Sequence, residues 1–324
     1  MKKIYLLLIS IIMLTIAGCS SDSNARSSGV SGESFIGGDK ALNFEFGENT
    51  PPLRVRDQSL QPFSVRLLVE NNGEFDIPEG RAHVSLTGFN AADLGMQETS
   101  KTLLALNGFK KQGSNTIPGG KQQVVFSDLK YVGSVVSGTY PLRMFANICY
   151  PYQTRAIVSL CINGDTVPSI DNRVKICDLD SQRRVSNSGA PVFIENVRQY
   201  PYGSSSIQIQ FDIRHKPISG DSNIYESGSI DNNCRLNGVS TSSTDALFKK
   251  DKVTYLVETG LEGLNCESTG SNSNVITLNA NTYTVTCIQD TTGESEYEKP
   301  ISIILDYDYL DRKSKTITIE HVQR

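Results

Sequence analysis

The sequence has little of what several large functional classes require. It contains no tryptophan, only three histidines and, apart from its N-terminus, no apolar run long enough to cross a bilayer as a helix. Basic residues are not in excess, because 31 Lys and Arg stand against 35 Asp and Glu, a net charge of −4. A multi-pass helical membrane protein is therefore excluded, and nucleic acid is not expected as a partner, since phosphate binding uses a basic surface. With 324 residues and 38% hydrophobic residues, the chain can still fill one to three domain cores.

Sequence signatures of catalysis are also missing. The chain contains no GxSxG, GxxxxGK[ST] or GxGxxG pattern and no CxxC pair that would favour zinc. His83, His215 and His321 lie on different segments, which excludes an HExxH metal site. We expect these histidines at the surface or at strand edges. The sequence thus predicts a protein that is not an enzyme and that has no metal or cofactor.

The N-terminus has the pattern of an export signal. Lys2 and Lys3 precede the apolar run Ile4–Ala17, which has the length of a signal-peptide core. The following Gly18-Cys19, within LTIAGCSS, resembles the prokaryotic lipobox, and this resemblance implies cleavage before Cys19 and a diacylglycerol on its thiol. An ordinary secretory signal is the alternative. We predict a signal peptide over 1–18 and a protein anchored to a membrane by this lipid, facing the cell exterior or the periplasm.

Residues 19–40 follow as a lipidated cysteine and a tether. The segment 20–40 holds seven Ser and four Gly. It offers too little apolar surface to offset the entropy of ordering, so we expect a flexible linker.

From Ala41 onward, apolar and polar residues alternate with period two, which is typical of strands with one buried face. At least seven strands fit before residue 180, and the alternation at Ser206–His215 is the clearest in the chain. We predict two antiparallel Ig-like β-sandwiches, at 41–180 and 190–324, joined by a polar linker at 181–189. Two loops are expected inside them, a break at Tyr150-Pro151-Tyr152 and a hairpin turn at 311–314.

Six cysteines follow Cys19, three in each predicted domain, and in an exported chain an even number indicates disulfides. If Tyr150-Pro151-Tyr152 is a hairpin loop, Cys149 and Cys161 lie too far apart to bond. We therefore favour Cys161–Cys177 and Cys266–Cys287. Cys149 and Cys234 are left to pair between the domains, to stay reduced, or to change this assignment.

Two repeated or clustered motifs could carry function. The tripeptide Tyr-Pro-Tyr occurs twice, and we expect its tyrosines to lie on loops that bind a partner or close the ends of a sandwich: Tyr150, Tyr152, Tyr200 and Tyr202. Carboxylates cluster at Asp306 and Asp308, which alternation places on the face opposite to Tyr307 and Tyr309. The EF-hand spacing is absent there, so solvated acids are expected rather than a calcium site.

Short segments resemble a known family. The run PFSVRLLVENNGEFDIPEG, Pro62–Gly80, looks like the opening hairpin of cell-adhesion-related (CARDB-like) Ig-like domains of prokaryotic surface proteins. The segment Cys149–Ile162 is similar to archaeal surface proteins with paired Ig-like domains. The absence of tryptophan departs from antibody-type domains. The resemblance implies display or adhesion at a cell surface and transfers no functional residue.

These observations predict a non-enzymatic, lipid-anchored surface protein that acts as an adhesion, scaffold or binding module, with a protein or a surface glycan as partner. One alternative is a glycan-active enzyme that uses carboxylates such as Asp306 and Asp308 in an interdomain cleft. Another is an envelope assembly subunit with an open edge strand, for which Ser206–His215 is the candidate.

Overall fold

The computed structural model describes residues 35–167, 175–237, 248–266 and 274–323. Over these ranges the backbone is mostly strand, with a short 3-10 helix, η2 (Ala91–Leu94). The chain is therefore all-β and built from several mainly antiparallel sheets, as expected. The predicted signal peptide, Cys19 and most of the predicted tether lie outside the described residues.

The strands differ greatly in length. In the first part of the chain they are β1 (Leu42–Phe46), β2 (Arg54–Arg56), β3 (Phe63–Asn71), β4 (His83–Thr87), β5 (Ser100–Thr102), β6 (Lys110–Gln112), β7 (Asn115–Ile117), β8 (Lys121–Leu129) and β9 (Thr139–Ile162). In the second part they are β10 (Ser181–Gln182), β11 (Val185–Asn187), β12 (Val192–Tyr202), β13 (Ser206–His215), β14 (Asn223–Tyr225), β15 (Lys252–Glu258), β16 (Leu264–Cys266), β17 (Val275–Thr277), β18 (Thr282–Asp290) and β19 (Tyr297–Glu320).

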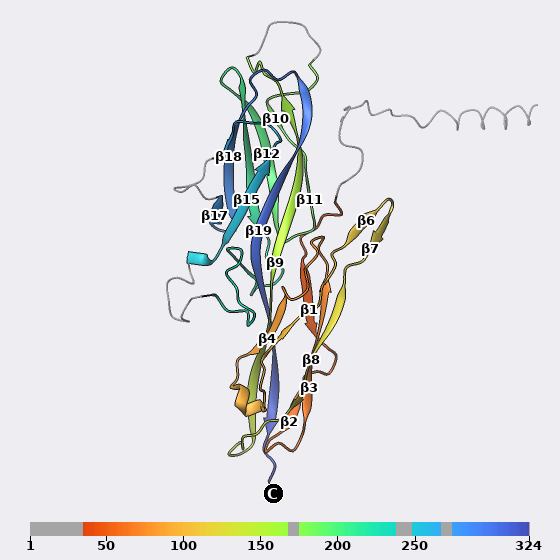
Figure 1. The fold of residues 1–324 in the computed structure, drawn as a ribbon. Coiled ribbons are helices and arrows are strands. Elements are labelled where there is room, and N and C mark those ends of the chain that lie inside the picture. Colours follow the sequence, from red (N-terminus) through yellow and green to blue (C-terminus); the bar gives the residue numbers. More distant parts are fainter. Residues whose placement is uncertain (1–34, 168–174, 238–247, 267–273, 324) are drawn as a thin grey trace, which may run out of the picture. The chain divides into compact units, whose positions relative to one another are not determined.

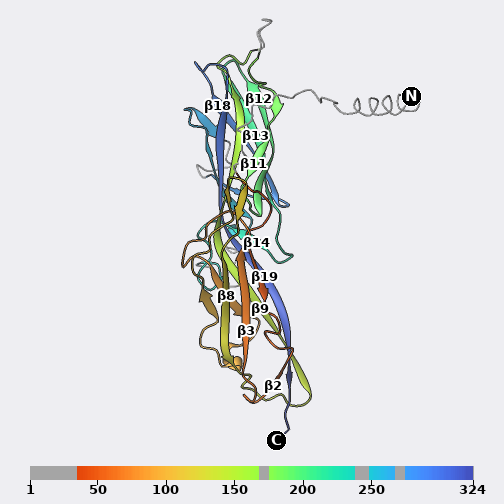
Figure 2. The same ribbon diagram turned by 90° about the vertical axis from the view of Figure 1, so that its right-hand side faces the viewer.

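The two longest strands, β9 and β19, form one continuous antiparallel ribbon. Each has 24 residues, and they pair in register from Ile162↔Tyr297 to Thr139↔Glu320. Figures 1 and 2 show them side by side along their whole length. The breaks expected at Tyr150-Pro151-Tyr152 and at 311–314 were therefore wrong.

The sheet pairing explains how the ribbon passes through Pro151. Strand β4 pairs with β9 only as far as Cys149, and β11 joins the same edge at Ala156. One edge of β9 thus has no partner strand at Pro151, where a residue without an N–H group is tolerated. The second expected break, at 311–314, contains neither Gly nor Pro, and its polar residues are compatible with a strand.

Two smaller sheets lie against different parts of the ribbon. The three-stranded sheet, in the order β1-β3-β8, approaches β19 where the Lys313 ammonium lies 5.4 Å from the Phe44 ring centre. The five-stranded sheet, β10-β12-β13-β18-β16, approaches β9 where the Thr154 hydroxyl donates to the Val192 carbonyl at 2.6 Å. The ribbon itself belongs to a nine-stranded sheet that includes the run β17-β15-β19-β9-β4-β5.

The predicted domain boundary differs from this arrangement. Residues 181–189 contain β10 and β11, which pair with β12 and β9 respectively. Strand β19, from the second predicted domain, pairs with β9 and β2 from the first. The ranges 41–180 and 190–324 therefore share one sheet, because long-range strand pairing joins segments that a polar stretch separates in sequence.

The period-two alternation correctly identified the buried faces. Ile207, Ile209, Phe211 and Ile213 of β13 are fully buried, as are Tyr307 and Tyr309 of β19. Strand β13 is not an open edge, however, since β12 pairs along one side and β18 along the other. The edge-strand expectation for Ser206–His215 was wrong, because alternation reports the buried face of a strand and not its lateral neighbours.

Candidate functional site

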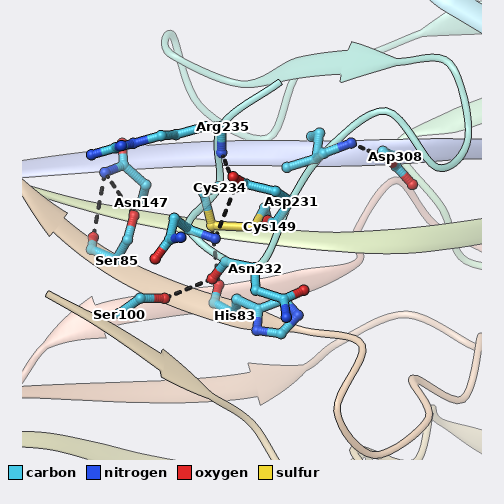
Figure 3. Close-up of a disulfide and its surroundings, with 12 residues drawn as sticks. His83, Ser85, Ser100, Asn147, Cys149, Asp231, Asn232, Cys234, Arg235 and Asp308 are labelled. Carbon is cyan, nitrogen blue, oxygen red and sulfur yellow. Dashed lines mark hydrogen bonds between the residues drawn. A yellow bond between two sulfur atoms is a disulfide. The ribbon is translucent and has the colours of Figure 1, made fainter. Parts of the chain in front are cut away.

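A disulfide fixes a loop to the outer face of the nine-stranded sheet. Cys149 lies in β9 directly opposite His83 of β4, and it is bonded to Cys234, 85 residues further along the chain. Because Tyr150 points into the core, its neighbour Cys149 faces outward. Figure 3 shows the sulfur bridge between the strand and the loop that carries Asp231 and Cys234.

Hydrogen bonds hold this loop, residues 226–237, at several points. The Asp231 carboxylate accepts the backbone N–H groups of Asn233 and Arg235, both at 2.8 Å. The Ser100 hydroxyl of β5 donates to the Asn232 carbonyl at 2.7 Å. The Asp308 carboxylate of β19 accepts the Ile230 N–H at 3.0 Å. The loop is therefore attached to three strands, by one covalent bond and by hydrogen bonds from two further strands.

A polar cavity of about 220 Å³ lies between this loop and the sheet. The side chains that bring charge or hydrogen-bonding groups to its lining are Arg81, His83, Asp231, Asn232, Asn237 and Asp308. They come from the segment before β4, from β4 itself, from the loop and from β19. We refer to this cavity as the loop pocket.

Burial shifts both titratable groups of the sheet that line the loop pocket. It lowers the pKa of His83, an effect that Asp231 opposes and Arg81 reinforces. It raises the pKa of Asp308, whereas backbone N–H groups of residues 228–230 and the Arg81 charge oppose this rise. His83 is therefore neutral at pH 7, and its Nδ1 lies 3.1 Å from the Thr102 hydroxyl. The pocket combines one guanidinium, two carboxylates, amide groups and a neutral imidazole.

The lining of the loop pocket offers groups that can bind a polar ligand. Both cysteines are oxidised, so neither offers a thiolate. One oxygen of Asp231 accepts two backbone N–H groups and one oxygen of Asp308 accepts the Ile230 N–H, so both carboxylates are oriented by the loop. Amide and guanidinium groups are the usual partners of hydroxyls and carboxylates in binding sites.

A second polar network lies beside the disulfide on the same face. The Arg312 Nε of β19 donates to the Asn147 side-chain oxygen at 2.7 Å. The Asn147 amide donates in turn to the Ser85 and Thr87 hydroxyls, at 3.3 and 3.0 Å. These residues fix the register of β4, β9 and β19 next to Cys149.

The structure separates the four tyrosines that the sequence grouped together. Tyr150 and Tyr152 are buried in the middle of β9, each 2% exposed, so they are not binding loops. Tyr200 is half-buried near the end of β12, and Tyr202 is exposed where β12 turns into β13. Of the four tyrosines, Tyr150 is among the residues that line the loop pocket. The prediction that Tyr150 and Tyr152 lie on a loop was wrong because β9 continues as a strand through Pro151.

The disulfides confirm the two favoured pairs, Cys161–Cys177 and Cys266–Cys287. Cys149 and Cys234 form the third, across the two halves of the sequence. Within the described ranges, one group of metal-type ligands comes together, Cys161, Cys177 and Glu296. Both sulfurs are already bonded to each other, and Glu296 accepts the N–H groups of Ile176 and Cys177. This cluster is a disulfide with a carboxylate that holds its loop.

The carboxylates Asp306 and Asp308 do lie on the face opposite to the tyrosines, as alternation predicts. Asp306 accepts a hydrogen bond from the Gln153 amide at 2.9 Å and does not line the loop pocket. Among the histidines, His83 and His215 are buried rather than at the surface. His321 is half-buried and lies 3.0 Å from a carboxylate oxygen of the buried Asp57.

Sequence reasoning missed the loop pocket itself. Once the other cysteines were assigned, Cys149 and Cys234 had no partner in the sequence analysis. These two unassigned cysteines were the available signal for a long-range disulfide. Nothing in the sequence indicates that Arg81 and His83 meet Asp231 and Asp308, because three separate segments bring these residues together.

The fold and the pocket define an all-β, disulfide-linked protein, a combination typical of an oxidising, extracytoplasmic compartment. Within the part of the chain that the structure describes, no helix is long and apolar enough to span a bilayer. Comparison with known protein families and with curated proteins found no match to the chain.

Proposed function

We propose that this protein is a non-enzymatic binding module, exported and anchored to a membrane through a lipid on Cys19. The observation that carries the binding function is the loop pocket, a polar cavity that the Cys149–Cys234 disulfide attaches to a rigid sheet. Binding residues are commonly found on loops that a rigid scaffold positions. The partner class that suits this lining is a surface glycan or a polar protein segment.

The architecture supports a display role of the Ig-like type. The three-stranded and the five-stranded sheet each lie against a part of the nine-stranded sheet, an arrangement similar to paired β-sandwiches. The segment Pro62–Gly80 resembles CARDB-like domains, and this resemblance implies display at a cell surface. In this proposal the scaffold is shared between the two halves rather than divided at a linker.

The binding function is tested by capture from native membranes with the full-length protein. Arg81→Ala and Asn232→Ala remove polar groups from the loop pocket, and we expect each to reduce recovery of the partner several-fold, since one hydrogen bond contributes about 1 kcal/mol. Arg184→Ala, an exposed arginine outside the pocket, is the matched control. Unchanged recovery in both pocket variants would contradict the proposal.

The anchor is tested separately. Cys19→Ala should abolish lipid labelling and either release the protein from the membrane fraction or leave its signal uncleaved. A lipid that persists in this variant would exclude Cys19 as the anchor while leaving the pocket proposal intact.

A glycan-active enzyme remains a second candidate because Asp231 and Asp308 line the same cavity and burial raises the pKa of Asp308, as a general acid requires. Glycan turnover by the purified protein that Asp308→Asn abolishes, without loss of binding, would favour this enzyme. Absence of turnover with intact binding would favour the module.

A further inference from the structure

Three segments meet around the buried carboxylate of Asp57. One oxygen of Asp57 accepts the Val322 N–H at 3.1 Å, and the other lies 3.0 Å from both the Val135 N–H and the His321 Nδ1. The Gln58 N–H also donates to the Gly133 carbonyl at 3.0 Å. We call residues 51–60, 130–140 and 318–322 the Asp57 end; Figure 1 shows β2 and the C-terminus of β19 within it.

Large apolar side chains project from the Asp57 end. Val136 is 97% exposed and Leu53 is 72% exposed, and they are accompanied by Leu60, Val132 and Tyr140. Hydrogen bonds fix the backbone beneath them, since the Thr318 N–H donates to the Leu53 carbonyl and the His321 N–H to the Gly138 carbonyl. These side chains therefore gather on segments that hydrogen bonds hold together, and apolar groups gathered at one exposed end favour a contact with a protein or a membrane.

The charges around these side chains are balanced. Arg54 forms an ion pair with Glu320 at 2.8 Å. Among the described residues, the Asp57 end also exposes the cations Arg56 and Lys130, and the exposed acids Asp93 and Asp128 lie on the neighbouring segments. Apolar side chains among charges of both signs suit the zwitterionic headgroup layer, whereas a protein partner of opposite charge would call for an excess of one sign. The Tyr131 and Tyr140 rings, 6.5 Å apart, add the amphipathic groups typical of that layer.

Chain length brings the Asp57 end within reach of the membrane that would carry Cys19. Strand β3 runs from Phe63, next to the Asp57 end, to Asn71, a distance of roughly 30 Å for nine residues. Just beyond it, the Glu74 carboxylate accepts the N–H groups of Ile36 and Gly37, at the start of the described chain. Cys19 precedes this point by a number of residues that can bridge at most roughly 55 Å.

We propose that the Asp57 end inserts Leu53, Leu60, Val132 and Val136 into the interfacial layer of the membrane to which the protein is anchored. This inference rests on the proposed lipid anchor and is independent of the loop pocket. A second, weak contact with the same membrane becomes effective because the anchor makes it intramolecular.

The absence of tryptophan from the chain provides a clean reporter. The lipidated full-length protein carrying Val136→Trp is reconstituted into phosphatidylcholine vesicles, with and without brominated acyl chains. We expect the tryptophan emission to shift to shorter wavelength and to be quenched by the brominated lipid. Leu104→Trp, at a position 61% exposed and outside the Asp57 end, is the matched control and should show neither effect.

Each outcome decides the inference. Vesicle-bound protein whose Val136→Trp emission matches that in buffer would overturn insertion while leaving the anchor in place. A shift to shorter wavelength without bromine quenching would show that a protein or a second copy covers this end, which also overturns it. Protein that does not float with the vesicles would refute the lipid anchor. In that case, bromine quenching of the Val136→Trp emission on addition of excess vesicles would still support insertion of the Asp57 end, and its absence would overturn it.

Discussion

The two Tyr-Pro-Tyr segments have the same sequence and opposite environments. In β9, Tyr150 and Tyr152 are buried and the strand continues on both sides of Pro151. In β12, the strand ends at Tyr202, which is 49% exposed at the turn into β13. A tripeptide whose sequence predicts a stiff aromatic loop is thus part of a strand in both places, buried in the core in β9 and partly exposed at the strand end in β12.

Partner strands account for this difference. Tyr150 and Tyr152 are paired in register with Tyr309 and Tyr307 of β19, with ring centres 5.6 and 6.0 Å apart. The comparable partners of Tyr200 and Tyr202 in β13 are Gln208 and Ser206. Aromatic rings opposite aromatic rings form a core, whereas rings opposite polar residues face water. The segment that lies across the sheet therefore decides the role of the motif.

Truncation of one tyrosine from each segment should give the largest contrast. Tyr152 packs in a fully buried cluster and its hydroxyl donates to the Gly189 carbonyl at 2.7 Å. We expect Tyr152→Ala to lower the free energy of unfolding by about 3–5 kcal/mol, and Tyr202→Ala to change it by less than about 0.5 kcal/mol. Denaturant titration measures both. Similar losses in the two variants would break the comparison.

A pH effect of intermediate size should come from the buried tyrosine region. The His215 ring lies 5.9 Å from that of Tyr309, and burial lowers the pKa of His215 from 6.5 to about 4, with a hydrogen bond to Asn281 opposing the shift. Above pH 6.5 the imidazole is neutral in both states and its contribution is complete. As the pH falls towards 4, the unfolded chain is protonated first, so up to about 3 kcal/mol of stability is lost.

This pH effect is isolated by comparing the wild type with His215→Gln. The stability of the variant should vary less between pH 6.5 and pH 4, the window of the shift. Parallel pH profiles for the two proteins would assign the loss to other groups.

The smallest expected difference in stability is between removal of the Tyr150 hydroxyl and removal of the Tyr152 hydroxyl. Among the described residues the Tyr150 hydroxyl has no hydrogen-bond partner, whereas that of Tyr152 binds the Gly189 carbonyl. Tyr150→Phe should leave stability unchanged or raise it slightly, because it removes an unpaired buried polar atom. Tyr152→Phe should cost about 1–2 kcal/mol, because it removes the hydrogen bond to the Gly189 carbonyl and the hydroxyl oxygen that accepts the Phe75 N–H. Equal thermal midpoints for the two variants would contradict this ranking.

Gly73 follows a strand end that the local sequence indicates correctly, but the structure gives a different reason for the glycine. Asn71-Asn72-Gly73 indicates the end of a strand in sequence, and β3 does end at Asn71. In the structure, a Cβ atom at Gly73 would lie 1.9 Å from the Tyr152 hydroxyl oxygen and 2.9 Å from the Gly189 carbonyl oxygen. Glycine is therefore required by the close approach of β9, which no local pattern reveals.

By itself, the sequence determined the all-β class, the buried face of strands such as β13, and two of the three disulfides. These features depend on alternation and on short separations such as that between Cys161 and Cys177, which neighbouring residues encode. Only the tertiary structure decided that β9 and β19 form one ribbon, that Cys149 bonds Cys234, and that Arg81, His83 and Asp308 line one cavity. The physical reason is that strand register and lateral neighbours are set by contacts between distant segments, and a single strand carries no record of which strand lies beside it.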